Sequence, residues 1–220
     1  MISINSEMLT PAEAAVVSSV EVRDVNQVID ESILPKDFYR VNPDRTRRLF
    51  ADACTFISFY FHAAKSLTAD ERLRAIAAAS PRLRAEPVSR LEKDWTIRQE
   101  FLTIDLAPFL KSVHQKLSEL GEARALVVED PHILGGTPVI RNTRVPVYDV
   151  AASLAAALPM KRILSAYPGL TAEMANLAAL YAAANPPRGR PREHSSPGAG
   201  ALIFSRRRTP RRKRTREAAR

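Results

Sequence analysis

The stretch from residue 129 to 185 constrains the fold more than any other part of the chain. It reads EDPHILGGTPVIRNTRVPVYDV and then PMKRILSAYPGLTAEMANLAALYAAAN. A turn region rich in glycine and proline leads into a short β-hairpin pattern, and three closely spaced apolar segments with helical periodicity follow. This layout predicts a small recognition module, and nothing in it has the pattern of a catalytic centre.

The whole chain is long enough for two compact units and a tail. It has 220 residues, of which 45% are hydrophobic, and single domains commonly span 50–250 residues. The predicted division is residues 5–85, residues 91–187 with a core at 125–187, and a tail at 188–220. No run approaches the roughly 20 apolar residues of a membrane span, and no signal peptide is evident. We therefore expect a cytoplasmic protein without a membrane partner.

The positive charge is concentrated at the C-terminal end. The formal net charge is +9, but residues 188–220 hold 12 Lys/Arg against 2 acids, and the rest holds 21 against 22. The tail has little apolar content, so it cannot bury enough surface to offset the entropy of ordering. We expect a disordered basic tail.

The first part of the chain has the pattern of a helix-turn-helix. Residues 10–13 (Thr-Pro-Ala-Glu) form a capping-box sequence and predict a helix that runs to about Ser18. Apolar residues in segment 21–31, namely Val22, Val25, Val28 and Ile29, recur at helical spacing. Residues 38–41 suggest a small β-wing, and a longer aromatic helix is predicted from Pro43 to Lys65.

The middle of the chain continues with helices and strands. The expected elements are a helix that begins with a second capping box at 68–71 and ends before Pro81, a linker over 80–90, a strand over 95–105, a helix over 108–120 that ends at Gly121, and a strand over 125–128. The resulting fold class is mainly helical α+β. It has an N-terminal winged helix-turn-helix and a homeodomain-like three-helix module preceded by a β-hairpin.

The C-terminal module resembles a known family. The carrying motifs are DPHILGGTPVIR at 130–141, TRVPV at 143–147 and YPGLT at 167–171; they look like domain-of-unknown-function family 433, whose members resemble VapB-type antitoxins of type II toxin-antitoxin pairs. Asn142 stands where the family usually has glycine, and residues 157–159 replace another common glycine. Asparagine tolerates a left-handed backbone best among ordinary residues, so Asn142 should keep the loop geometry.

The N-terminal stretch TPAEAAVVSSVEVRDVNQVIDESILP resembles the winged helix-turn-helix of MerR-like regulators, with Ser32 in place of a frequent glycine. This resemblance implies DNA binding and autoregulation. Arginine pairs with guanine edges, and asparagine or glutamine with adenine. The acids Glu21, Asp24, Asp30 and Glu31 favour the alternative, a solvated face on a protein-interaction helix. The candidate DNA-binding residues are Arg23, Asn26, Gln27, Arg40 and Arg45, with Arg47 and Arg48 in the same basic patch.

The candidate toxin-binding residues are arginines. Arg141 and Arg144 flank a turn, where planar guanidinium groups can hold carboxylates bidentately. The expected target is the acidic site of a PIN-type ribonuclease toxin, and Arg188 and Arg190 would extend the contact. In the alternative reading, Arg144 pairs internally with Asp130 or Asp149 and braces the hairpin.

Catalysis is not expected, and neither is a cofactor or a metal. The four histidines are scattered, without ligand spacing, and Cys54 lies among aromatic residues that predict a buried thiol. The aromatic residues between Pro43 and Lys65 exceed one helix stripe and suggest a homodimer, or a hetero-oligomer with the toxin. We expect an antitoxin; the alternatives are a free-standing DNA-binding transcription regulator and a small interaction adaptor.

Overall fold

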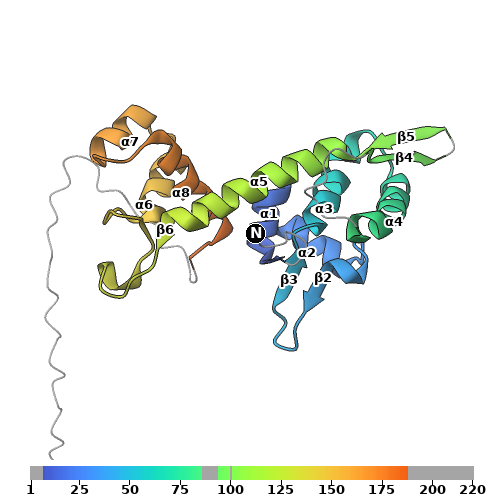
Figure 1. Ribbon diagram of the computed structural model, residues 1–220, viewed down its shortest axis with the longest axis horizontal. Coiled ribbons are helices and arrows are strands. Elements are labelled where there is room, and N and C mark those ends of the chain that lie inside the picture. The colour runs from blue at the N-terminus through green and yellow to red at the C-terminus, as the bar shows by residue number, and fades with distance from the viewer. Residues whose placement is uncertain (1–6, 86–93, 100, 188–220) are drawn as a thin grey trace, which may run out of the picture. The chain divides into compact units, whose positions relative to one another are not determined.

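The computed structural model describes residues 7–85, 94–99 and 101–187 (Figure 1). Within them the chain is a mainly helical α+β protein with three small antiparallel sheets. None of the described helices is long and apolar enough to cross a membrane. The predicted tail with Arg188 and Arg190, and residues 86–90 of the predicted linker, lie outside the described residues.

The first two helices follow the predicted pattern. Strand β1 (Met8–Leu9) leads into α1 (Pro11–Ser18), and the predicted capping box is confirmed. The backbone N–H of Thr10 donates to the Glu13 carboxylate at 2.7 Å, and the N–H of Glu13 donates to the Thr10 hydroxyl at 3.2 Å. Helix α2 (Val22–Asp30) buries three of its four predicted apolar residues, Val25, Val28 and Ile29, whereas Val22 is 42% exposed.

The predicted helix from Pro43 to Lys65 is wrong in its first part. A one-turn helix η2 (Lys36–Phe38) leads into β2 (Tyr39–Val41), which pairs with β3 (Arg47–Phe50); β3 also pairs with β1. In the turn between β2 and β3, the backbone N–H of Thr46 donates to the Asp44 carboxylate at 3.0 Å. Such a side-chain bond competes with helix formation and stabilises the turn.

The aromatic helix is shorter than predicted and buries its own rings. Helix α3 (Ala53–His62) begins only after β3, and η3 (Ala63–Lys65) follows it. Phe56, Ile57 and Phe59 are at most 1% exposed, because they lie in the core of this same chain. These three side chains therefore do not form an exposed apolar face, and the homodimer expected from this helix stays a prediction.

Helix α4 (Ala69–Ala85) starts at the second capping box as predicted, but it does not end before Pro81. The Ser80 hydroxyl donates to the Ile76 carbonyl at 2.6 Å, and Leu83 beyond the proline is fully buried. Packing on both sides of Pro81 therefore offsets the backbone hydrogen bond that a proline removes from a helix.

The predicted single strand over 95–105 is a hairpin of β4 (Thr96–Gln99) and β5 (Leu102–Asp105). Helix α5 (Ala107–Leu126) runs through Gly121 and does not end there. The buried positions Val113, Leu117, Leu120 and Ala123 continue at helical spacing across the glycine, so packing keeps the helix intact. Near its end, Arg124 forms ion pairs with Glu7 and with Glu13, which fix α5 beside α1.

The predicted hairpin and three helices follow α5. Strand β6 (Val127–Val128) pairs with β7 (Val139–Ile140), a one-turn helix η4 (Leu134–Gly136) lies between them, and the helices are α6 (Val147–Ala155), α7 (Met160–Ala166) and α8 (Ala172–Ala184). These elements enclose a second, smaller apolar core. Helix α8 also packs on α5 and α1, and its Ala184 belongs to the first core.

Candidate functional site

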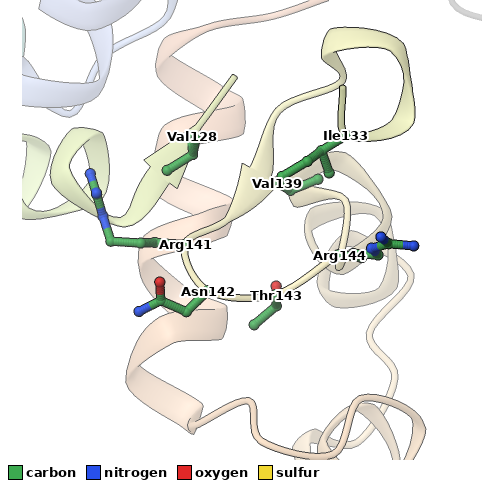
Figure 2. Close-up of a pocket in the computed structure, with 7 residues that line it drawn as sticks. All are labelled: Val128, Ile133, Val139, Arg141, Asn142, Thr143 and Arg144. Atoms are coloured by element: carbon green, nitrogen blue, oxygen red, sulfur yellow. The ribbon is translucent and has the colours of Figure 1, made fainter. Parts of the chain in front are cut away.

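The β6–β7 hairpin and the loop after it line a hollow of about 620 Å³ (Figure 2). Its apolar lining comes from the two strands and from Ile133, which immediately precedes η4. Its polar lining comes from the loop 141–144. The lining residues are Val128, Ile133, Val139, Arg141, Asn142, Thr143 and Arg144.

Hydrogen bonds hold the backbone of this loop in one conformation. The N–H of Arg141 donates to the Leu126 carbonyl at 2.7 Å, and the N–H of Thr143 donates to the Ile140 carbonyl at 3.0 Å. The Thr143 hydroxyl donates to the same Ile140 carbonyl at 2.7 Å. Asn142 has φ 62°, which confirms that it takes up the left-handed backbone expected of it.

Arg141 has a structural contact. Its Nε donates to the Ala125 carbonyl at 2.8 Å, at the C-terminal end of α5. That end carries free carbonyls and partial negative charge, so a guanidinium group there stabilises the helix. In Figure 2 the side chains of Arg141 and Arg144 leave the loop in different directions. The loop therefore does not bring the two guanidinium groups together.

Arg144 is exposed at the rim of the hollow. In residues 7–85, 94–99 and 101–187, no ion pair joins it to Asp130, to Asp149 or to another acid. Asp130 accepts instead from the backbone N–H of His132 at 2.8 Å. The internal pairing considered from the sequence is thus not formed within the described part.

The turn beside the hollow is left-handed over three successive residues. Leu134, Gly135 and Gly136 have φ values of 48°, 66° and 85°. The two glycines make a tight turn, as their sequence predicts. Leu134 is 54% exposed in this conformation, although a left-handed backbone disfavours leucine. The exposure of Leu134 was not predicted, because Ile133 and Leu134 are both apolar and no sequence pattern distinguishes them.

The three candidate residues on α2 all contact α2 itself or the residues at its two caps. Arg23 pairs with Glu21 at 3.0 Å, and the Gln27 amide donates to Glu31 at 3.0 Å. The Asn26 amide donates to the Val22 carbonyl at 3.0 Å, and its oxygen accepts from Arg47 of β3 at 2.9 Å. Asn26 thus links α2 to the β2–β3 hairpin.

Arg47 also donates to the Asp30 carboxylate, at 2.6 and 3.2 Å, and braces the hairpin against α2. The sequence did not reveal this contact, since the two residues lie in different elements. The other hairpin candidates, Arg40 and Arg45, are exposed. The Arg40 guanidinium lies over the Phe50 ring at 5.3 Å, and Arg45 occupies the turn with φ 63°.

The remaining reactive groups are dispersed. Cys54 is fully buried, as predicted, and this burial raises the pKa of its thiol to about 12. His62 bonds through Nδ1 to the carbonyl of Ser58 at 2.8 Å, within its own helix. The described residues contain no group of three or more His, Cys, Asp or Glu side chains arranged to hold a metal ion.

Two comparisons relate the chain to known proteins. Residues 127–182 match the family described as protein of unknown function (DUF433), which is the module that encloses the hollow. The chain is also 52% identical over 214 residues to the uncharacterized protein y4eO of Sinorhizobium fredii, with 96% of each chain covered. No solved structure matches the chain significantly. The chain therefore belongs to the same protein family as y4eO, and it carries a DUF433 module at residues 127–182.

Proposed function

We propose that this protein is the antitoxin of a cytoplasmic type II toxin-antitoxin pair and that it inhibits a PIN-type ribonuclease. The observation that carries the proposal is Arg144, an exposed guanidinium group on a fixed loop beside a partly apolar hollow. Within the described residues no acid neutralises it. It is therefore available to a carboxylate of another molecule.

The chemistry of the partner suits this arrangement. A PIN-type nuclease holds its metal ion with clustered carboxylates, and an inserted guanidinium group would pair with them and exclude the ion. Arg141 would act indirectly, because its bond to the Ala125 carbonyl fixes the loop that presents Arg144. A loop that is already ordered loses little entropy on binding. Arg188 and Arg190 remain candidates for the same partner.

Autorepression through operator DNA is the second part of the proposal. Helices α1 and α2 are joined by a short turn and followed by the β2–β3 hairpin, an order that supports a winged helix-turn-helix. The exposed Arg40 and Arg45 lie on that hairpin and suit phosphate contacts. Arg23, Asn26 and Gln27 on α2 were the candidates for base contacts, but each of them already bonds to another group of the protein, which favours the hairpin as the DNA contact.

The same N-terminal elements favour one alternative, a free-standing DNA-binding transcription regulator with no toxin partner. The neighbouring reading frame discriminates between the two. A short PIN-like protein encoded there would support the antitoxin, and its absence would favour the regulator.

The decisive test is co-expression with the product of the neighbouring reading frame, followed by co-purification and a growth assay. We expect a stable complex that restores growth, and we expect Arg144→Ala to lose the rescue. Arg162→Ala is the matched control, because Arg162 is an exposed arginine on α7 of the same module and does not line the hollow. A partner that is not toxic, or equal rescue by both variants, would overturn the proposal.

A further inference from the structure

Two arginines lie directly opposite each other on the β2–β3 hairpin. In the antiparallel register Arg40 pairs with Arg48, Tyr39 with Leu49, and Val41 with Arg47. Side chains in such a pair have Cβ atoms about 4.5–5.5 Å apart, and like charges there destabilise the sheet. A cost of this kind indicates that the two charges serve something other than folding.

The two faces of the β2–β3 hairpin differ in their contacts. Side chains alternate along a strand, so Tyr39, Leu49 and Arg47 share the face towards the protein. Leu49 is fully buried on that face, and Arg47 is held by Asp30. Arg40 and Arg48 lie on the opposite face and are exposed. The loop end of the hairpin projects beyond α2 (Figure 1).

The outer-face charges are not neutralised within the described part of the chain. No ion pair there includes Arg40, Arg45 or Arg48. Arg40 donates to the Tyr39 carbonyl at 3.2 Å and lies over the Phe50 ring. Arg45, in the turn, adds a third positive charge. Arg40 and Arg48 thus form a compact cationic surface on the outer face of the β2–β3 hairpin.

Helix α2 has the opposite character. Its single basic residue is Arg23, whereas Asp24 and Asp30 lie in the helix and Glu21 and Glu31 at its caps. Arg23 pairs with Glu21 and with Asp24. Asn26 uses both its amide and its oxygen inside the protein. Acids repel phosphates, and a side chain that is already bonded cannot read a base edge without breaking its bonds.

We propose that the outer face of the β2–β3 hairpin, formed by Arg40 and Arg48 and extended by Arg45 in the turn, binds the phosphate backbone of duplex nucleic acid independently of its sequence. This inference rests on the DNA-binding part of the proposed function and narrows it, because it assigns the contact to the hairpin and not to α2. A single strand is a poorer ligand for this face. Stacking of unpaired bases needs an open aromatic ring, and the Arg40 guanidinium covers a face of Phe50.

The experiment compares full-length variants that all keep the same basic tail. Binding is followed by fluorescence anisotropy over a salt series, with three probes of equal length: a duplex from the gene's own promoter, an unrelated duplex and a single strand. The variants are Arg40→Gln with Arg48→Gln, Arg48→Gln alone, Gln27→Ala on α2, and Arg98→Gln. Arg98 is the matched control, since it is an exposed arginine on the separate β4–β5 hairpin.

We expect the double variant to weaken binding to both duplexes by the same factor, about tenfold or more at 0.1 M salt. The slope of log K against log salt should fall by about two, and by about one for Arg48→Gln alone. Gln27→Ala and Arg98→Gln should change neither the affinity nor the salt slope. The melting midpoint of the double variant should stay equal or rise, because a like-charge pair has been removed.

Three results would overturn the inference. One is that the affinity and the salt slope are unchanged in the hairpin variants. If the double variant has a lowered melting midpoint, this test is made with Arg48→Gln alone. Another is a loss in Gln27→Ala that is confined to the promoter duplex, which would assign recognition to α2. The third is a larger loss for the single strand than for the duplexes. The growth assay separates this inference from the antitoxin role, since the double variant should still restore growth.

Discussion

The C-terminal end of α6 has an alanine where the backbone favours glycine. Ala157 has φ 54°, its N–H donates to the Leu154 carbonyl at 2.9 Å, and the N–H of Leu158 donates to the Ser153 carbonyl at 3.2 Å. These bonds form a Schellman motif, in which glycine is the usual left-handed residue. The Cβ of alanine crowds the following carbonyl in this conformation, at a cost of about 1–2 kcal/mol. Ala157→Gly should remove that cost.

The expected gain is smaller than the relieved strain, because glycine also increases the entropy of the unfolded chain. That entropy costs roughly 0.5–1 kcal/mol. The free energy of unfolding should therefore rise by about 0.5–1 kcal/mol in Ala157→Gly. For a protein of this size, such a gain corresponds to an increase of about 1–4 °C in the melting midpoint.

Ala156→Gly is the matched control. Ala156 is exposed like Ala157, but it has φ −76° and ψ 9°, so glycine relieves no strain there. The control should lose about 0.5–1 kcal/mol. Thermal unfolding and urea unfolding of the two variants should thus shift in opposite directions. A lower midpoint in Ala157→Gly, or shifts of the same sign in both, would refute the strain argument.

Two further predictions concern buried charge and the brace between α2 and the hairpin. Burial raises the pKa of the Asp52 carboxyl to about 7, whereas an unfolded aspartate has a pKa of about 3.9. The free energy of unfolding should therefore fall as pH rises from about 4 to about 7. In urea unfolding, Asp52→Asn should raise the free energy of unfolding by up to about 4 kcal/mol at pH 8 and by almost nothing at pH 3. An equal gain at both pH values would contradict this. In a double-mutant cycle of Arg47→Met and Asp30→Asn, we expect a coupling of about 0.5–1 kcal/mol, since the side chains are 28% and 58% exposed; zero coupling would exclude the brace.

Local patterns predicted the features that depend on neighbouring residues. Both capping boxes formed as the sequence indicates, because a cap needs partners only a turn apart. The left-handed Asn142 followed from its intrinsic tolerance. The prediction that a helix begins at Pro43 was wrong for a related reason. Asn42-Pro43-Asp44 fits the first turn of a helix as well as it fits a β-turn, and only the pairing of β3 with β1 and β2 decides between them.

That mistake also concealed the arrangement of charges on the hairpin. If residues 45–48 were helical, Arg45 and Arg48 would occupy neighbouring positions on a helix surface, and Arg40 would lie in another element. Pairing in the observed register instead places Arg40 beside Arg48 and turns Arg47 towards Asp30. The consecutive residues Arg47 and Arg48 therefore differ in role: Arg47 pairs with Asp30, and Arg48 lies exposed on the outer face. No composition or spacing rule separates them before the strand is known.

The roles of Arg141 and Arg144 depend in the same way on where α5 ends. A helix that ended at Gly121 would leave Ala125 in the following strand, and both arginines would then be equivalent groups on one turn. Because apolar positions continue past Gly121, α5 extends to Leu126 and brings the Ala125 carbonyl within 2.8 Å of Arg141 Nε. The mistake about the helix end therefore also concealed the contact of Arg141 with α5, whereas the toxin contact expected of each arginine stays a prediction. Removing the Arg141 guanidinium should loosen the loop. Under the proposed function, removing the Arg144 guanidinium should weaken binding of the toxin.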